Sequence, residues 1–246
     1  MRIARTVAGM ASVIGVGLLS FGQAAMAGPS RAIFAYSDGT AAGSVLLTVN
    51  TAGGPLVFQP SVTGTYDQNG GLVSGNYLAG VCGSSDGCAG DDLTRRDFFV
   101  FQLTGLRATV TGATLSLYNP DVSIDPGTGT PLPAGYISTL PALGYAAFDV
   151  TSALDPVTGA SAAANVYGDL GGGVFYGAKT VTAADDGQFV TLSLNTAAVA
   201  AINRANGGTV SIGGTVTQVP EPASLAVLSL GFGAMTLARR RRRAVC

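Results

Sequence analysis

Histidine and tryptophan are absent from this sequence of 246 residues, and lysine occurs once, as Lys179. Histidine is the usual general base beside a serine or cysteine nucleophile and the commonest protein ligand of transition metals. Its absence excludes most hydrolase triads and most zinc sites. The length allows one medium-sized domain once the two terminal segments described below are set aside.

Charge is also scarce, because only 11% of the residues are Asp, Glu, Lys or Arg. The formal net charge of −1 hides an uneven distribution. Between Gly28 and Pro222 six cationic residues face fourteen acidic ones, so this span carries about −8, and the balancing arginines lie at the two ends. Nucleic-acid binding needs Lys and Arg to neutralise phosphates, so the composition argues against it. An acidic surface instead suits a soluble exported protein.

The N-terminal segment has the three parts of a secretory signal peptide. Arg2 and Arg5 form a basic region, an apolar region follows over residues 7–21, and no charged residue lies between Arg5 and Arg31. Ala25 and Ala27 then provide the small residues that signal peptidase recognises, which predicts cleavage before Gly28. The alternative, a retained membrane helix or a buried core helix, fits poorly with the short apolar region and its small-residue end. Residues 1–27 are therefore predicted to be a removed signal helix.

The C-terminal segment combines a proline motif, an apolar run and a basic cluster. Val219, Pro220, Glu221 and Pro222 precede the apolar run 223–238, which five arginines follow: Arg239, Arg240, Arg241, Arg242 and Arg243. As a helix this run is about 24 Å long, which is short for a hydrocarbon core of about 30 Å. The arginines predict that the chain end stays in the cytoplasm and that everything before Pro220 lies outside.

This order of features resembles the PEP-CTERM sorting signal. The resemblance covers residues 219–246, with 219–222 as the recognition motif, 223–238 as a short transmembrane helix and 239–243 as the stop-transfer cluster. It implies recognition and removal of the tail by an exosortase, a membrane protease, in a Gram-negative bacterium that makes exopolysaccharide. The alternative is an ordinary tail anchor. Under both interpretations the protein is directed to the cell surface.

The segment between the two ends reads as a β-rich domain, 28–218. Short stretches that alternate apolar and polar residues are separated by Gly, Asn, Asp and Pro, which is typical of strands with one buried face. The expected strands are 32–37, 45–50, 56–63, 97–103, 113–118, 146–151, 173–176, 189–194 and 209–216. The fold class predicted is all-β, an antiparallel β-sandwich or jelly roll with one short helix, 196–206. Two long loops, 64–96 and 121–141, are expected at one end, where binding would take place.

Parts of this domain also resemble a known family. They look like a β-sandwich domain found ahead of PEP-CTERM tails and similar to DNRLRE-type carbohydrate-binding modules. The segments that carry the resemblance are 65–67, 75–80, 97–103, 110–115 and 148–151. Because these segments are mostly framework strands, the resemblance implies a fold more than a function.

Cys82 and Cys88 are separated by five residues in a glycine-rich stretch. In an oxidising compartment they are expected to form a disulfide, which would stabilise the fold by roughly 2 kcal/mol. A metal role would need more ligands than two sulfurs. Cys246 lies in the tail and would be lost on processing.

Acidic residues cluster near these cysteines. Asp86, Asp91 and Asp92 are weak candidates for calcium ligands, since calcium takes six to eight oxygen ligands. Their spacing differs from that of an EF-hand loop, and solvated loop acids are the alternative. Asp185 and Asp186 form a second acidic pair. No other cofactor is expected.

Three functions can be weighed for the domain. Tyrosines in or beside the expected loops could stack on sugar rings, although tyrosines at strand ends are commonly core residues: Tyr66, Tyr77, Tyr136, Tyr145 and Tyr176. Cleavage of a glycosidic bond would need a paired acid and base, and the domain has only Asp for both. Ice binding would need a regular threonine repeat, which is not visible.

We therefore expect a non-enzymatic protein, exported across the inner membrane of a Gram-negative bacterium and processed by signal peptidase and an exosortase. Before processing it would be held in the membrane by its C-terminal helix. At the surface or in the medium it would interact with exopolysaccharide or serve as a structural component of a biofilm. The alternative is a surface enzyme that acts on polysaccharide with Asp catalysts.

Overall fold

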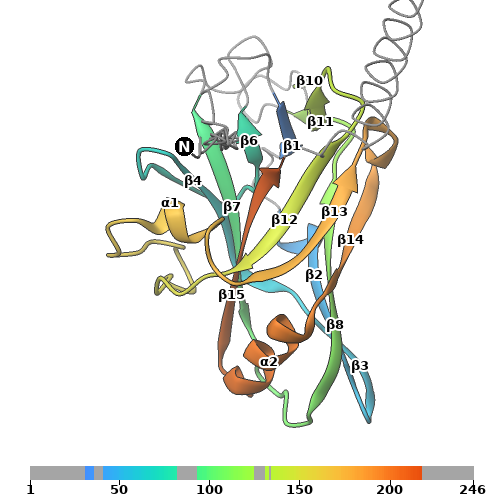
Figure 1. The fold of residues 1–246 in the computed structure, drawn as a ribbon, viewed down its shortest axis with the longest axis vertical. Helices are drawn as coiled ribbons and strands as arrows, with labels where there is room; N and C mark the ends of the chain where they lie inside the picture. Colours follow the sequence, from blue (N-terminus) through green and yellow to red (C-terminus); the bar gives the residue numbers. More distant parts are fainter. Residues whose placement is uncertain (1–30, 36–40, 82–92, 125–130, 133, 218–246) are drawn as a thin grey trace, which may run out of the picture.

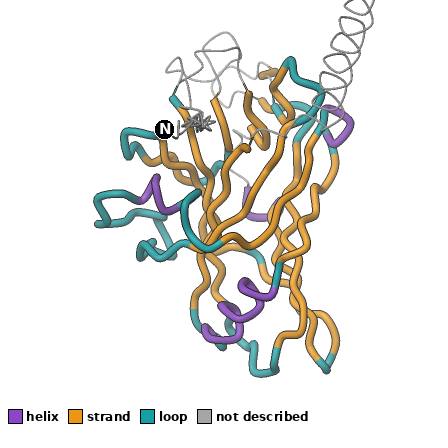
Figure 2. Tube along the Cα trace, in the orientation of Figure 1, coloured by secondary structure: helices purple, strands orange, loops and turns teal. Residues whose placement is uncertain are grey.

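A computed structural model describes residues 31–35, 41–81, 93–124, 131–132 and 134–217. Most of them lie in strands, and every strand pairing within this part of the chain is antiparallel. The all-β, antiparallel class predicted from the alternating pattern is therefore confirmed (Figures 1 and 2).

Nine strands form the larger sheet, in which β7 is the central element. β7 pairs with β4, β6 and β15, and the sheet continues from β15 through β12 to β13, and from β6 through β1 to β11. Its strands are β1 (Arg31–Ala35), β4 (Pro60–Asp67), β5 (Leu72–Ser74), β6 (Ala79–Val81), β7 (Thr94–Gln102), β11 (Gly135–Ser138), β12 (Leu143–Asp149), β13 (Phe175–Val181) and β15 (Thr209–Thr217).

The smaller sheet has four strands in the order β14, β8, β2, β3. They are β2 (Val45–Thr51), β3 (Gly54–Phe58), β8 (Val110–Asn119) and β14 (Gln188–Leu194). Buried and more exposed residues alternate along β2 and β8, as the period-2 pattern predicts for strands with one face on a core. Two short strands, β9 (Ser123–Ile124) and β10 (Pro131–Leu132), pair separately.

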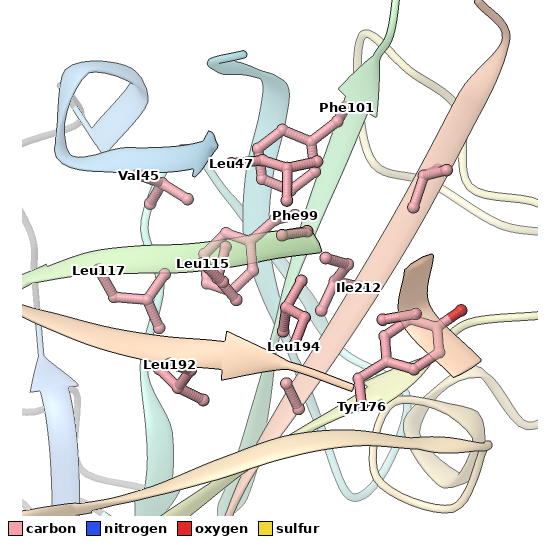
Figure 3. Packing of buried hydrophobic residues seen from close by; sticks show 14 of the residues in the cluster. Val45, Leu47, Phe99, Phe101, Leu115, Leu117, Tyr176, Leu192, Leu194 and Ile212 are labelled. Carbon is pink, nitrogen blue, oxygen red and sulfur yellow. The ribbon is translucent and has the colours of Figure 1, made fainter. Parts of the chain in front are cut away.

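The main core lies between the two sheets, in a sandwich-like arrangement. Figure 3 shows side chains from both layers meeting there: Val45, Leu47, Leu115, Leu117, Leu192 and Leu194 from the smaller sheet, and Phe99, Phe101, Tyr176 and Ile212 from the larger one. Burial of this apolar surface is the main force that holds the sheets together.

A second cluster covers the opposite face of β7. Phe98 and Val100 point away from the main core and pack with residues that follow β12, including Leu154, Val166 and Leu170. Because both faces of β7 are buried, its sequence is continuously apolar from Phe98 to Phe101 instead of alternating. The segment 150–172 thus acts as a cover over one face of the larger sheet.

The predicted short helix is confirmed as α2 (Thr196–Ala205). Asn195 caps its first turn by accepting hydrogen bonds from the backbone N–H groups of Ala197 and Ala198, and Asn206 ends it in a left-handed conformation with φ 32°. The structure adds a one-turn helix that the sequence pattern did not predict, α1 (Val166–Asp169), and two 3-10 turns, Ala41–Ser44 and Ala183–Asp185.

Several predicted boundaries were wrong. The expected strand 56–63 is two strands, β3 and β4, separated at Gln59. The expected loop 64–96 contains the end of β4, all of β5 and β6 and the start of β7, and the expected loop 121–141 contains β9, β10 and β11. The structure describes only parts of both segments. Their strands β5, β6, β9, β10 and β11 are shorter than five residues, which is too short for an alternating pattern to be recognised.

Candidate functional site

None of the residues predicted to carry processing, a disulfide or calcium lies in the described part of the chain. Cys82, Cys88, Asp86, Asp91 and Asp92 fall in residues 82–92, and the signal cleavage site and the C-terminal motif with its arginines fall in 1–30 and 218–246. Those predictions therefore stand untested by the structure. Within the described residues, no helix has the length and apolar character needed to cross a membrane.

A concave polar surface lies where the segment 150–172 meets the β4–β5 turn. We call it the tyrosine hollow, because Tyr66 and Tyr167 line it. It has a volume of about 170 Å³. The remaining lining residues are Gln68, Asn69, Gly70, Ser161, Ala163, Ala164, Asn165 and Val166. No charged side chain lines it, and its amide, hydroxyl and aromatic groups are those that bind sugar hydroxyls and ring faces.

Arg96 of β7 fixes one wall of the tyrosine hollow. Its Nη1 donates hydrogen bonds to the backbone carbonyls of Tyr167 at 2.8 Å and Gly168 at 3.1 Å, and its guanidinium lies 4.3 Å from the Tyr167 ring centroid. Guanidinium groups are attracted to the faces of aromatic rings. A single strand residue therefore holds both the backbone and the ring of α1. Its Nε is buried without a hydrogen-bond partner among the described residues.

Tyr66 of β4 anchors the opposite wall. Its hydroxyl donates to the carbonyl of Gly159 at 2.9 Å, and its ring packs against Phe98 with centroids 5.7 Å apart. Burial raises the pKa of Tyr66, against a smaller opposing effect of a hydrogen bond to the backbone of Ser161. Gly159 has φ 74°, and the space where its side chain would stand is filled by the Phe98 ring. The segment 150–172 is thus fitted onto β4 and β7.

A second concave surface, the Asp169 hollow, adjoins the first one. It has a volume of about 420 Å³ and shares Ala163 and Asn165 with the tyrosine hollow. Asp169 lines it, but its carboxylate already accepts hydrogen bonds from the N–H of Ser152 at 2.6 Å and the hydroxyl of Thr151 at 3.0 Å. Asn165 accepts from the N–H of Gly168 and so caps α1. The two hollows form adjoining concavities along one segment.

Most tyrosines proposed to stack on sugars are core residues instead. Tyr77, Tyr145 and Tyr176 are fully or almost fully buried, and Tyr136 is half-buried with its hydroxyl on the carbonyl of Leu140. Of these five tyrosines, Tyr66 lines the tyrosine hollow, although it is itself 5% exposed. Tyr167, which the sequence reading missed, is the more exposed ring there. It follows the alanine-rich run 162–164, and no strand or turn motif marks it.

The acidic pair predicted at 185–186 has a structural role. Oδ1 of Asp186 accepts hydrogen bonds from Nδ2 of Asn119 and the N–H of Tyr136, each at 2.8 Å. Burial raises the pKa of Asp186, and the nearby carboxylates of Asp121 and Asp185 raise it further, while these hydrogen bonds lower it. In the described part of the chain, no group of three or more Asp, Glu or Cys could hold a metal ion.

One carboxyl group is deeply buried. Asp97 of β7 is 0% exposed, and burial raises its pKa from 3.8 to about 7. Its Oδ1 accepts a hydrogen bond from the Tyr145 hydroxyl at 2.8 Å, and its Oδ2 has no partner among the described residues. A raised pKa is typical of catalytic acids, but a side chain without exposed surface cannot reach a substrate.

The fold and the hollows define an all-β domain with an uncharged polar concavity on the cover of its larger sheet. Beyond this domain, the model of the PEP-CTERM protein-sorting motif matches residues 218–243. This confirms the predicted sorting signal and indicates an exported, surface-associated protein of a Gram-negative bacterium that an exosortase processes. The match does not extend into the sheets. No curated protein and no solved structure matches the chain.

Proposed function

We propose that this chain is exported, loses its tail to an exosortase, and interacts with exopolysaccharide at the cell surface or in a biofilm without catalysing a reaction. The sorting motif at 218–243 is the observation that carries the proposal. The N-terminal pattern supports it, since residues 1–27 have the basic, apolar and small-residue parts of a signal peptide cleaved before Gly28. The run 223–238 would hold the precursor in the membrane, with arginines 239–243 in the cytoplasm.

The tyrosine hollow supports a carbohydrate ligand. Its lining is uncharged, combines the half-buried Tyr167 ring with amide and hydroxyl groups, and adjoins the Asp169 hollow, so that a chain of sugars could occupy both. An aromatic face binds the apolar face of a sugar ring, while amides bind its hydroxyls. The resemblance of the framework strands to carbohydrate-binding modules agrees with this assignment.

The enzymatic alternative has less support. Hydrolysis of a glycosidic bond uses two carboxyl groups that flank the bond. The tyrosine hollow is lined by no carboxylate and the Asp169 hollow by one, whose oxygens accept hydrogen bonds from Thr151 and Ser152. Asp97, which has the raised pKa, is buried in the interior.

The intact mass of the exported protein tests the sorting part of the proposal. A species that begins at Gly28 and ends near Pro222 is expected, about 2 Da lighter than its reduced form if Cys82 and Cys88 are joined. A species that keeps Arg239–Arg243 would contradict removal of the tail and would indicate a tail-anchored protein.

Affinity electrophoresis through extracted exopolysaccharide tests the binding part. The protein should be retarded, and the polysaccharide should show no new reducing ends. Tyr167→Ala should abolish the retardation, Tyr167→Phe should keep most of it, and Tyr118→Ala on the smaller sheet should not change it. Retardation that survives Tyr167→Ala would exclude the tyrosine hollow, and release of reducing ends would favour the enzyme.

A further inference from the structure

The smaller sheet differs from the rest of the molecule in its charge. None of its four strands, β2, β3, β8 and β14, contains Asp, Glu, Lys or Arg. The strands of the larger sheet, in contrast, include Asp67, Asp97, Asp149 and Lys179. Because the span 28–222 carries about −8, two copies of the domain repel each other across most of their surface. This repulsion is weakest when the two copies approach each other through their smaller sheets.

The outward face of this sheet carries no charged side chain from its four strands. The register places Ser193, Thr114 and Thr48 opposite one another in one row across three strands. In the next row the hydroxyls of Thr191 and Ser116 lie 2.9 Å apart. These strands therefore offer no cation or carboxylate that could bind a charged partner on this face.

One edge of the smaller sheet is tied at its end to the larger sheet, and the other has no further neighbouring strand among the described residues. Beside β14, the backbone and side-chain N–H groups of Asn195 donate to the carbonyls of Tyr176 and Phe175, which ties this edge to β13. At the other end, β3 has β2 as its sole partner among the described residues. Figure 1 shows the β2–β3 hairpin at the outer margin of the molecule, on the side away from α1.

The β3 edge lacks most of the features that prevent pairing between exposed strands. Such edges are commonly protected by charged side chains, bulges or proline. β3 has no charged residue, its register with β2 is continuous, and Leu56 and Val57 are 40% and 58% exposed. Its proline is Pro55, near the start. Proline is tolerated in a strand where its nitrogen faces away from the ladder, and Val57, two residues on, directs its N–H the same way.

We propose that two copies of this chain pair antiparallel along β3 and join their smaller sheets into one continuous sheet. The same strand on both copies makes the contact self-complementary, so a two-fold axis closes the assembly at a dimer. Addition of a strand to an open edge supplies backbone hydrogen bonds without a dedicated pocket. We choose a second copy as the partner because two acidic domains repel each other least where their uncharged sheets come together. Neither hollow involves β3, so this inference is independent of glycan binding.

Sedimentation equilibrium of the protein in the form the host exports tests the proposal. A monomer–dimer equilibrium is expected. Val57→Pro removes the outward N–H of β3 while leaving the ladder to β2, and should raise the dimer dissociation constant at least about tenfold. Val57→Thr keeps the N–H and the branched side chain and should leave it within about twofold. A protein that stays monomeric, forms larger species, or dimerises equally well as Val57→Pro would overturn the proposal.

A second pair of variants covers the case in which Val57→Pro does not fold, as judged by far-UV circular dichroism. Val57→Lys places a like charge on both copies at the contact and should weaken the dimer, whereas Val157→Lys, at a position 76% exposed in the segment 150–172, should not. Hydrogen exchange of the unmodified protein gives an independent readout. The β3 amides should exchange more slowly as the concentration rises, and exchange that does not depend on concentration would contradict the proposal.

Discussion

The hydroxyl of Tyr145, on β12, donates a hydrogen bond to Oδ1 of Asp97, on β7, at 2.8 Å, and both residues are 0% exposed. Burial raises the pKa of Tyr145 well above its usual value, and the adjacent Asp97 carboxylate raises it further. Gly214 of β15 makes room for this pair, because a side chain there would collide with both oxygens. An acidic group is thus held in the interior by one neutral donor.

This pair predicts that stability depends on pH in an unusual direction. The pKa of Asp97 is about 7 when folded and about 3.8 when unfolded, so the folded state binds the proton more tightly. The contribution of Asp97 to the free energy of unfolding is full below about pH 4 and is lost as the pH rises to about 7. At 1.36 kcal/mol per pKa unit, the loss is on the order of 4 kcal/mol. Asp97→Asn removes the charge and should raise the free energy of unfolding at about pH 8 but change it little at about pH 4.

Urea unfolding at the two pH values measures this effect. Asp155→Asn provides the matched control, because hydrogen bonds from the backbone of Thr158 and Val157 lower the pKa of that exposed carboxylate. Its contribution has the opposite sign and is lost as the pH falls. Equal changes for Asp97→Asn at both pH values would show that the pKa of Asp97 is the same in the folded and unfolded states.

Arg96 carries the second prediction, which concerns the wall of the tyrosine hollow. Lysine at this position cannot reproduce both the two carbonyl contacts and the contact with the Tyr167 ring, so Arg96→Lys should lower the free energy of unfolding by about 1–2 kcal/mol. It should also speed hydrogen exchange of the α1 amides and weaken retardation by exopolysaccharide. Arg107→Lys, on an exposed loop, should do neither. Unchanged exchange in Arg96→Lys would show that α1 is held by other contacts.

The alternating strands of the smaller sheet and helix α2 could be predicted from sequence because local signals there agree with the tertiary structure. β2, β8 and β14 have one buried face, so their patterns report it directly. The tyrosine hollow could not be predicted in the same way. It depends on the packing of the segment 150–172 against Phe98 and on the long-range bonds of Arg96 to Tyr167, which have no local pattern. The burial of Asp97 could not be predicted either, because an aspartate at the start of the expected strand 97–103 would lie at the surface unless both faces of that strand are buried.

The cap of α2 gives a third prediction. Oδ1 of Asn195 accepts from two backbone N–H groups of the helix, and its Nδ2 donates to the carbonyl of Phe175 at 2.8 Å. Asn195→Ala removes all three bonds and should lower the free energy of unfolding by about 1–2 kcal/mol. Asn195→Asp keeps the two acceptor contacts and loses only the donor, so it should cost less. Thermal and urea unfolding of the three proteins would measure this order, and equal losses would show that the helix cap contributes nothing beyond the bond to β13.

The fit of the segment 150–172 onto β7 can be tested at Gly159. Alanine there must adopt φ 74° and displace the Phe98 ring, which is also in contact with Tyr66. Gly105→Ala isolates the first of these costs, because Gly105 has φ 92° and open space around it. A left-handed conformation costs a non-glycine residue about 1–2 kcal/mol, and overpacking adds about 1–3 kcal/mol. Urea unfolding should therefore show a larger loss for Gly159→Ala than for Gly105→Ala, with faster hydrogen exchange across 159–168 in the first variant alone. If both variants lose the same stability, the Phe98 ring yields without cost and the segment is not packed tightly against β7.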